Sequence, residues 1–348
     1  MQSNDGGISK FHAGIRGIRS YLPETRLTNE MLEQEYPEWN TESIYKKTGI
    51  STRGVSAPDE CASDLGVMAA NRLFDSEICS PEEVDFLLFC TQSPDYFLPT
   101  TACLMQDRLG IPPNSGALDF NLGCSGFVYG LSLAKGLIET GSAANVLLIT
   151  SETYMKFINP TDRTVRTIFS DGASATLVSR TNSEDTLIGP FVFGTDGRGA
   201  NELIVPAGGS RKPIAPETSL EKQAEGGIFR SQQNLYMNGP KILTFTLEIM
   251  PRLVQDLLEK SSSSLGQVDY FVFHQANKFL LEQLRRKIKI PEEKFCVNLE
   301  PYGNTVSSTI PMALELAIEQ EEIQSGDKVM IAGFGVGYSW AGAMIQFT

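Results

Sequence analysis

Basic residues, histidine and long hydrophobic runs are scarce in this chain of 348 residues. Its 42 Asp and Glu outnumber 29 Lys and Arg, which gives a net charge of −13 and argues against a nucleic-acid or anionic-membrane partner. No apolar run approaches membrane-spanning length, and the first residues have neither the basic nor the apolar region of an export signal. We therefore expect a cytoplasmic protein that binds neither nucleic acid nor membrane.

The small number of histidines and the spacing of the cysteines limit which metal and catalytic sites the chain can form. The two histidines are His12 and His274, and no two of the six cysteines are spaced as Cys-x-x-Cys. Two histidines argue against a multi-histidine metal centre, and scattered cysteines without an export signal indicate free thiols. We expect no metal site and no resident cofactor.

Short apolar runs alternate with longer amphipathic stretches along the chain. Four runs are almost wholly apolar, as expected for strands buried on both faces: residues 84–89, 145–149, 268–273 and 328–332. Residues 124–140 and 311–320 have the length and pattern of helices. This alternation predicts a layered α/β fold. Residues 200–230 are rich in glycine, proline and charge, which predicts a surface excursion.

The two halves of the chain resemble each other. Residues 84–92 match 268–276 at an offset of 184, and a helical stretch follows each copy. The match predicts an internal duplication, with an N-terminal half at 1–182 and a C-terminal half at 183–348. Residues from the two halves could then meet where the halves face each other.

Cys124 lies in the sequence Gly-Cys-Ser-Gly-Phe, at a predicted strand-to-helix junction. A thiol at a helix N-terminus lies beside free N–H groups and the positive end of the helix dipole, which lower its pKa and favour the thiolate. A small buried cysteine in a tight turn fits the local sequence equally well. Both interpretations stay open on this segment alone.

Three segments of the second half also carry candidate chemistry. His274 follows the apolar run 268–273, at the strand end where α/β active sites collect, although a lone histidine is more often structural. Asn304 lies in Gly-Asn-Thr, where a helix N-cap is the simpler role. The loop 333–337, Gly-Phe-Gly-Val-Gly, precedes a predicted strand and no helix, so its N–H groups suit a reacting oxygen better than a phosphate.

Together, these four segments in this order resemble β-ketoacyl-acyl-carrier-protein synthase III, a family of thiolase-fold condensing enzymes. The resemblance runs from Gly17 to the C-terminus and includes residues 48–50 and 159–163. It implies a thiolase-like, five-layered αβαβα fold of two duplicated halves, and a homodimer. Elongating synthases need a second catalytic histidine, but the chain's other histidine is His12, near the N-terminus. Thiolases need a cysteine in the glycine loop, and residues 333–337 contain none. The catalytic set that the resemblance leaves is Cys-His-Asn. Plant-type polyketide synthases share that set, but the flanking residues favour synthase III.

The resemblance implies a decarboxylative Claisen condensation. Cys124 takes the acyl group of a primer thioester, carried by coenzyme A or an acyl carrier protein. His274 and Asn304 stabilise the enolate formed when malonyl-acyl carrier protein loses CO2, and the N–H groups of Cys124 and Val336 hold the tetrahedral oxyanion. Phe334 lines the apolar wall beside the malonyl carboxylate. Coenzyme A and phosphopantetheine thioesters are therefore substrates and not cofactors.

The resemblance also assigns substrate-binding positions, and the chain departs from the family pattern near them. The assigned residues are Arg163, Asn277, Gly239, Ile242 and Leu98. Ser43 stands where relatives that use acetyl coenzyme A carry a tryptophan that stacks on adenine, and Trp39 would replace it only after a shift of that helix. Leu98 stands where relatives carry a phenylalanine that closes the acyl pocket of the second subunit. The smaller side chain suggests a longer or bulkier primer.

A basic run stands out in this acidic chain, and it consists of Lys278, Arg285, Arg286, Lys287 and Lys289. A solvated helix face paired with the acidic residues 292–293 would explain it simply. By resemblance, Arg286 and Lys287 match positions that dock the acidic carrier protein.

Two other functions stay open on the sequence. An acyltransferase of the same fold would pass the acyl group to an alcohol, amine or sugar without decarboxylation. A non-catalytic partner subunit would keep the fold for assembly alone, but such a chain is expected to lose its nucleophile, and Cys124 is present.

Overall fold

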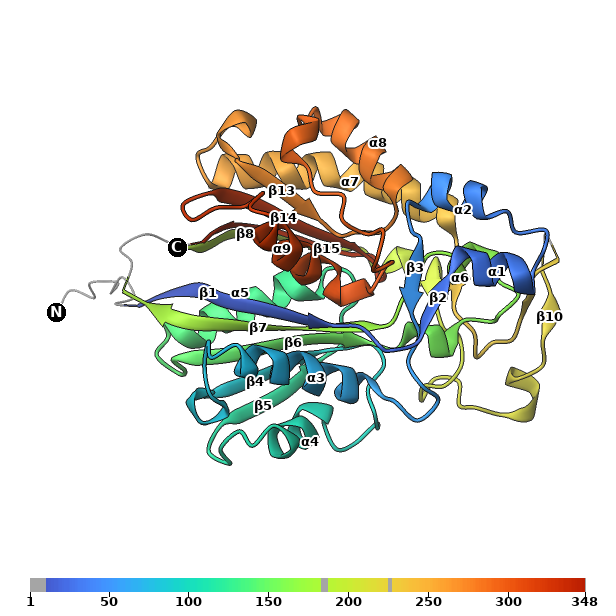
Figure 1. Ribbon diagram of the computed structural model, residues 1–348, viewed down its shortest axis with the longest axis horizontal. Helices are drawn as coiled ribbons and strands as arrows, with labels where there is room; N and C mark the ends of the chain where they lie inside the picture. Colours follow the sequence, from blue (N-terminus) through green and yellow to red (C-terminus); the bar gives the residue numbers. More distant parts are fainter. Residues whose placement is uncertain (1–10, 183–186, 225–226, 348) are drawn as a thin grey trace.

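Two central β-sheets form the framework of the protein in a computed structural model, which describes residues 11–182, 187–224 and 227–347 (Figure 1). The first sheet has the strand order β1-β7-β6-β4-β5. These strands are His12–Tyr21, Gly172–Thr181, Asn145–Glu152, Phe86–Cys90 and Gly116–Phe120. The second sheet has the order β13-β14-β15-β8. Its strands are Tyr270–Phe273, Lys328–Gly335, Ser339–Gln346 and Ile188–Thr195.

The two sheets repeat the same pattern of strand order and direction. In the first, β4 is parallel to β6, and β7 and β1 follow in antiparallel pairing. In the second, β13 is parallel to β14, and β15 and β8 follow in antiparallel pairing. A single parallel bridge between Phe271 and Phe295 stands where β5 lies in the first sheet. The predicted boundary between 182 and 183 borders residues outside the described ones, so the division at that point stays a prediction.

Helices make three further layers, which gives the predicted five-layered arrangement (Figure 1). Helices α3 and α4, at Ala62–Asp75 and Thr101–Arg108, cover the outer face of the first sheet. Helices α5 and α9, at Gly126–Glu139 and Thr309–Glu319, lie between the sheets. Helices α7 and α8, at Gly239–Lys260 and Lys278–Ile288, cover the outer face of the second sheet.

The central helices α5 and α9 are apolar on most sides because a sheet lies on either side of them. Phe127 and Leu131 of α5 are fully buried in one cluster with Ile310 of α9 and with strand residues of both sheets. Burying a side chain of this size contributes about 1.5–3 kcal/mol. At Gly130, an added Cβ would stand 2.5 Å from a methyl carbon of Leu148, so glycine lets α5 pack closely on β6. This packing fixes where the N-terminus of α5 lies.

Short elements gather at one end of the layers, on the right in Figure 1. They are α1, α2 and α6, at Asn29–Glu35, Thr41–Thr48 and Arg163–Arg166. The paired strands β2 and β3 are Arg26–Thr28 and Thr52–Gly54, β9 and β12 are Leu203–Ile204 and Tyr236–Met237, and β10 and β11 are Lys222–Gln223 and Phe229–Arg230. In the residues that the structure describes, the predicted excursion 200–230 contains only short elements of this kind. No helix in the described parts of the chain is long and apolar enough to cross a membrane.

Candidate active site

Cys124 lies in the turn between β5 and α5, as the sequence predicts. The turn is closed by the N–H of Gly126, which donates to the carbonyl of Gly123 at 2.7 Å. A Cβ on Gly126 would stand 2.3 Å from Cys90 Sγ, so only glycine allows the helix to begin this close to the end of β4. The Cys124 side chain is 4% exposed. The first half therefore places a buried thiol just before the N-terminus of its central helix, α5.

The glycine loop of the second half lies against this thiol. A Cβ built on Gly335 would stand 2.9 Å from Cys124 Sγ, and one built on Gly333 would stand 2.3 Å from the Cys124 carbonyl oxygen. On the other side of the turn, a Cβ on Gly123 would stand 2.8 Å from a methyl carbon of Val336. The end of β14 and the Cys124 turn are thus in direct contact. The role of the Val336 N–H as an oxyanion donor stays a prediction.

His274 follows β13 and reaches the same end of β14. Its N–H donates to the carbonyl of Ala332 at 2.8 Å, and its ring packs edge-on against Phe334, with 5.4 Å between ring centroids and 80° between planes. Phe334 lies between the two glycines that contact Cys124. The His274 ring is buried, and burial lowers its pKa to about 3, so the imidazole is neutral at pH 7.

Asn304 is fixed by hydrogen bonds of both its backbone and its carboxamide. Its N–H donates to the carbonyl of Ile168 at 2.9 Å, which ties the second half to the segment before β7. Its Oδ1 accepts the N–H of Val306 at 2.9 Å, so its Nδ2 is directed away from that turn. Nδ2 lies 3.5 Å from the carbonyl of Ala276, two residues after His274. The carboxamide donor therefore lies beside the His274 segment.

Val306 joins these groups and carries backbone strain. Its φ is 56°, in the left-handed region, where a β-branched residue is unusual and costs on the order of 1–3 kcal/mol. Its side chain is buried in one apolar cluster with Cys124. Strain of this kind persists where the surrounding structure fixes the residue. Val306 thus links the Asn304 turn to the apolar cluster that contains Cys124, and the meeting of Cys124, His274 and Asn304 stays a prediction.

The electrostatics of Cys124 differ from the expectation. Burial, with a smaller contribution from the nearby Glu152 carboxylate, raises the pKa of the thiol to about 12, although the backbone N–H acts in the opposite direction. The expected lowering of the pKa by the helix N-terminus is wrong, because removal of the thiolate from water outweighs the helix dipole here. At pH 7 the thiol is protonated.

Glu152 is a buried group that the sequence interpretation missed. It ends β6 and accepts hydrogen bonds from the Gln92 N–H at 3.0 Å, the Ser93 hydroxyl at 3.2 Å and the Ser307 hydroxyl at 3.0 Å. Burial raises its pKa to about 8 against the effect of these bonds. Ser307 lies in the turn after Asn304, so this carboxyl ties that turn to the first half. The signal available in the sequence was this acidic residue shortly after the apolar run 145–149.

Two family models match the halves of the chain that carry these groups. One, described as 3-oxoacyl-[acyl-carrier-protein] synthase III, matches residues 118–197, and its C-terminal counterpart matches residues 258–347. The β-ketoacyl-[acyl-carrier-protein] synthase III of Caldanaerobacter subterraneus subsp. tengcongensis is 36% identical over 339 residues, which are 97% of this chain and 99% of that protein. The chain belongs to the synthase III family.

Other synthase III proteins extend the comparison. A synthase III of Halalkalibacterium halodurans is 37% identical and covers 97% of both chains. A crystal structure of a 3-oxoacyl-(acyl-carrier-protein) synthase III is 52% identical, with a TM-score of 0.95, and covers 97% of this chain and 100% of that one. The predictions of the family and of the thiolase-like fold are confirmed.

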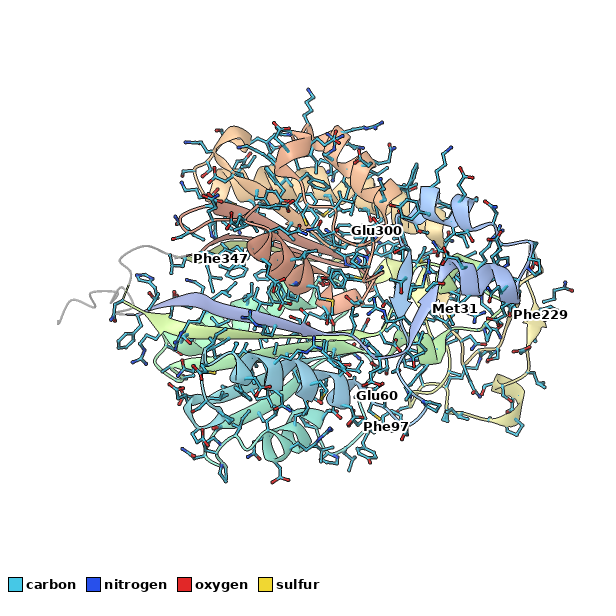
Figure 2. All side chains as sticks on the ribbon, viewed as in Figure 1. Met31, Glu60, Phe97, Phe229, Glu300 and Phe347 are labelled. Atoms are coloured by element: carbon cyan, nitrogen blue, oxygen red, sulfur yellow. The ribbon has the colours of Figure 1, made fainter. Side chains whose placement is uncertain are left out.

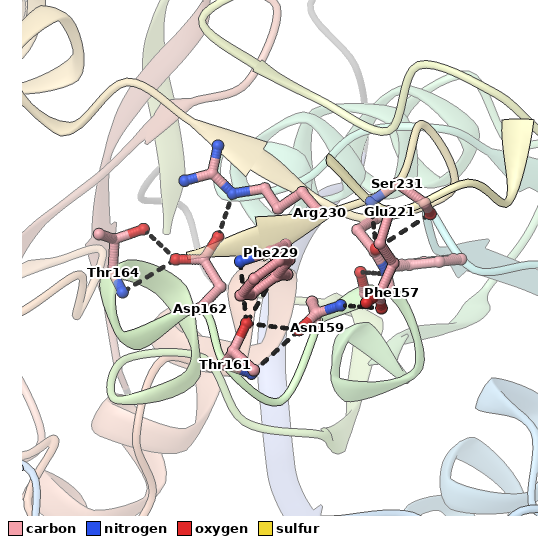
Figure 3. A network of polar contacts seen from close by, with 10 residues as sticks. Phe157, Asn159, Thr161, Asp162, Thr164, Glu221, Phe229, Arg230 and Ser231 are labelled. Atoms are coloured by element: carbon pink, nitrogen blue, oxygen red, sulfur yellow. Dashed lines mark hydrogen bonds and ion pairs between the residues drawn. The ribbon is translucent and has the colours of Figure 1, made fainter. Parts of the chain in front are cut away.

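Arg163, a predicted synthase III substrate position, is exposed at the start of α6. Figure 3 shows the polar contacts of the residues on either side of it. The Asp162 carboxylate accepts the N–H of Thr164 at 3.0 Å and pairs with Arg230. The Thr161 hydroxyl oxygen accepts the N–H of Phe229 at 3.0 Å. These bonds tie the excursion 200–230 to the segment that carries Arg163.

The other predicted synthase III substrate positions lie in different surroundings. Ile242 borders the apolar cluster around Cys124, and Gly239 begins α7 with no atom within 4 Å of an added Cβ. Asn277 is the N-cap of α8, where its Oδ1 accepts the N–H of Leu280 at 2.9 Å. This structural use accounts for Asn277 without a substrate, and a substrate contact there stays a prediction.

Leu98 lies in the loop between β4 and α4 and is 82% exposed. The neighbouring Phe97 is 85% exposed and stands at the surface (Figure 2). Two large apolar side chains exposed side by side are unusual on a monomer surface.

Trp39 does not take the place of the missing adenine-stacking tryptophan in this arrangement. It is buried before α2 begins, and its ring stacks on Tyr36 with 4.4 Å between centroids and 18° between planes. Ser43 is exposed on α2. The tryptophan half of the family's adenine clamp is therefore not formed.

The basic run on α8 divides into structural and exposed members. Arg285 is largely buried and bonds Glu282 at 3.0 Å and Glu292 at 3.3 Å, whereas Arg286 and Lys287 are exposed. Helix α2 packs beside α8 and adds two exposed lysines that sequence spacing did not connect with the run. We call this surface the basic face of α2 and α8: Lys46, Lys47, Lys278, Arg286, Lys287 and Lys289.

Within the part of the chain that the structure describes, no three His, Cys, Asp or Glu side chains are grouped so that they could hold a metal ion.

Proposed function

We propose that this chain condenses an acyl thioester primer with malonyl-acyl carrier protein and releases CO2 and a 3-oxoacyl thioester, a reaction of fatty acid biosynthesis. The contact of Cys124 with the end of β14, where His274 also packs, carries the proposal. It brings a nucleophile from one half to hydrogen-bond donors from the other. Membership of the synthase III family supports the same reaction.

The first half-reaction loads the primer onto Cys124. The sulfur attacks the thioester carbonyl, the carbon–sulfur bond of the primer breaks, and the thiol proton leaves on the released thiol. The tetrahedral oxyanion accepts hydrogen bonds from the N–H groups of Cys124 and Val336. Each such donor is worth about 3–4 kcal/mol of barrier. The primer is a thioester of coenzyme A or of phosphopantetheine on a carrier protein.

The second half-reaction forms the carbon–carbon bond. The malonyl thioester oxygen accepts hydrogen bonds from His274 Nε2 and Asn304 Nδ2, so the enolate left by loss of CO2 is stabilised. The enolate carbon attacks the acyl-cysteine, the carbon–sulfur bond breaks, and Sγ takes up a proton. The buried Phe334 ring supplies an apolar wall beside the departing carboxylate.

Two surfaces complete the proposal. The basic face of α2 and α8 docks the acidic carrier protein, because it concentrates positive charge on a chain of net charge −13. The exposed pair Phe97 and Leu98 packs against a second copy of the chain in a homodimer, where Leu98 lines the acyl pocket of that copy. Arg163, Gly239, Ile242 and Asn277 line the path of the thioester.

Release of labelled CO2 from malonyl-acyl carrier protein tests this function. With an accepted primer, the wild-type enzyme should release one CO2 for each 3-oxoacyl product. Asn304→Ala should still be acylated on Cys124 but release CO2 roughly 100-fold more slowly. Transfer of the acyl group to an alcohol, amine or sugar without release of CO2 would overturn the condensation and support the alternative acyltransferase.

A further inference from the structure

One hydroxyl group, that of Thr309, lies within hydrogen-bond distance of both the buried His274 imidazole and a backbone carbonyl. His274 Nδ1 lies 2.7 Å from the hydroxyl oxygen of Thr309, the first residue of α9. The same oxygen lies 3.1 Å from the carbonyl of Val306. Thr309 has a single hydroxyl proton, so it donates to either the ring nitrogen or the carbonyl, but not to both at once.

The direction of this bond decides which ring nitrogen carries the proton. His274 is neutral at pH 7, so one nitrogen holds a proton and the other a lone pair. If Thr309 donates to Val306, the ring must donate through Nδ1, and Nε2 is left as an acceptor. If Thr309 donates to Nδ1, Nε2 carries the proton and is a donor.

The geometry favours the second arrangement. The contact with Nδ1 is the shorter of the two, and 2.7 Å is the ordinary length of a strong bond donated by a hydroxyl. Val306 also links the groups, because its N–H holds the Asn304 carboxamide and its carbonyl lies beside Thr309. The strained turn from Asn304 to Thr309 thus orients both hydrogen-bond donors that an enolate would need.

We propose that the Thr309 hydroxyl donates to His274 Nδ1 and holds the ring in the Nε2–H tautomer, which makes Thr309 a positioning residue for the decarboxylation step. The inference rests on the proposed condensation, since only that half-reaction needs a donor at Nε2. Loading of Cys124 does not require this tautomer.

The chain's two histidines make a direct test practical. Protein labelled with 15N at histidine gives signals from two imidazoles, and the His12→Gln variant assigns them. The wild-type enzyme and Thr309→Ser should both show the nitrogen shifts of an Nε2–H tautomer for His274 at pH 7. An Nδ1–H pattern in the wild type would overturn the proposal, and this reading requires no substrate.

Kinetics of the two half-reactions separate positioning from general damage. Thr309→Val has nearly the shape of threonine but no hydroxyl. It should lower kcat for release of CO2 roughly 100-fold, leave KM for malonyl-acyl carrier protein nearly unchanged, and leave the rate of Cys124 acylation within about threefold. Thr309→Ser should restore most of the lost rate. Wild-type release of CO2 by a folded Thr309→Val would also overturn the role.

A failure of the Thr309 proposal can be told apart from a failure of the proposed condensation, and from a variant that does not fold. If the wild type releases no CO2 with any primer, the condensation is refuted, while the nitrogen shifts still report the direction of the Thr309 bond. If Thr309→Val does not fold, the wild-type spectrum and the rate of Thr309→Ser still decide the proposal.

Discussion

Gly335 lies directly against Cys124, although the two residues belong to opposite halves of the chain. A Cβ built on Gly335 would stand 2.9 Å from Cys124 Sγ and 3.1 Å from its Cβ. Gly335 is the last residue of β14, and Cys124 precedes α5. The second half therefore supplies one wall around the nucleophile, and the absence of a side chain there leaves room for an acyl group on sulfur.

Gly335→Ala should block acylation of Cys124 while the protein still folds. The added methyl group would displace the sulfur or the loop, and a misplacement of reacting atoms that approaches about 1 Å costs about 100-fold in rate. The measurement is the rate of acyl-enzyme formation by intact mass. Gly136→Ala in α5 is the matched control, since an added Cβ there meets no atom within 4 Å. Normal acylation of Gly335→Ala would refute this contact.

Glu152→Gln should make Cys124 more reactive toward iodoacetamide at pH 8. The ionised carboxylate is one cause of the raised pKa of the thiol, and a neutral amide of the same shape removes it. Ser307 can accept from the new amide group, because its hydroxyl rotates. The alkylated residue is identified by peptide mass, with the exposed Cys103 as an internal control. An unchanged rate at Cys124 would contradict the coupling.

The same variant should change how stability depends on pH. The pKa of Glu152 is raised to about 8 in the folded protein, so the folded state holds a proton that the unfolded state releases above its usual range near 4.5. The wild type therefore loses stability as pH rises through this window, up to about pH 8. In urea unfolding between pH 6 and 8, Glu152→Gln should lose less stability than the wild type. A variant that loses as much or more would contradict the assignment.

His274 should make the protein less stable in mild acid. Its pKa is lowered to about 3 by burial, so the unfolded chain binds a proton below about 6.5 that the folded chain does not. Stability is then lost as pH falls from 6.5 toward 3, by up to about 2 kcal/mol between pH 7 and 5. His274→Asn should reduce the difference in unfolding free energy between these two pH values. An equal difference in both proteins would show that the ring is not buried as a neutral group.

Arg286→Glu should raise KM for malonyl-acyl carrier protein roughly tenfold at low salt and leave KM for a small malonyl thioester unchanged. The reason is that a reversed charge on the basic face of α2 and α8 repels the acidic carrier but does not touch the reacting atoms. Arg252→Glu is the matched control, because Arg252 is 69% exposed on α7, outside that face. Equal effects on both substrates, or an equal effect of the control, would refute docking at α8.

Sequence patterns predicted the elements that place the site. Short apolar runs predicted β4, β6, β13 and β14, and the match between 84–92 and 268–276 predicted that the second half repeats the first. These signals are local, since burial on both faces leaves a nearly continuous apolar run in each strand. His274 follows one of these strands, and the internal duplication places Cys124 and Asn304 in opposite halves, so the sequence also predicts that the three residues meet.

Other features depend on contacts that no local pattern records. Thr309 and Glu152 act through partners at 274 and 307, from distant parts of the chain. The sign of the Cys124 pKa shift depends on burial by β14, whereas the sequence showed only the helix terminus. Lys46 and Lys47 belong to the basic face only because α2 packs against α8 in the folded chain. The burial of Trp39 depends on its stacking against Tyr36, which the sequence pattern does not indicate.

The decisive measurement follows the mass of the intact enzyme through both half-reactions. After incubation with a panel of acyl coenzyme A and acyl carrier thioesters, the wild type should gain one acyl group, and Cys124→Ala should gain none. Addition of malonyl-acyl carrier protein should remove that group from Cys124 and transfer it into a 3-oxoacyl carrier product, while the malonyl carboxylate leaves as CO2. An adduct that persists in Cys124→Ala, or one that malonyl-acyl carrier protein does not discharge, would contradict the proposed reaction.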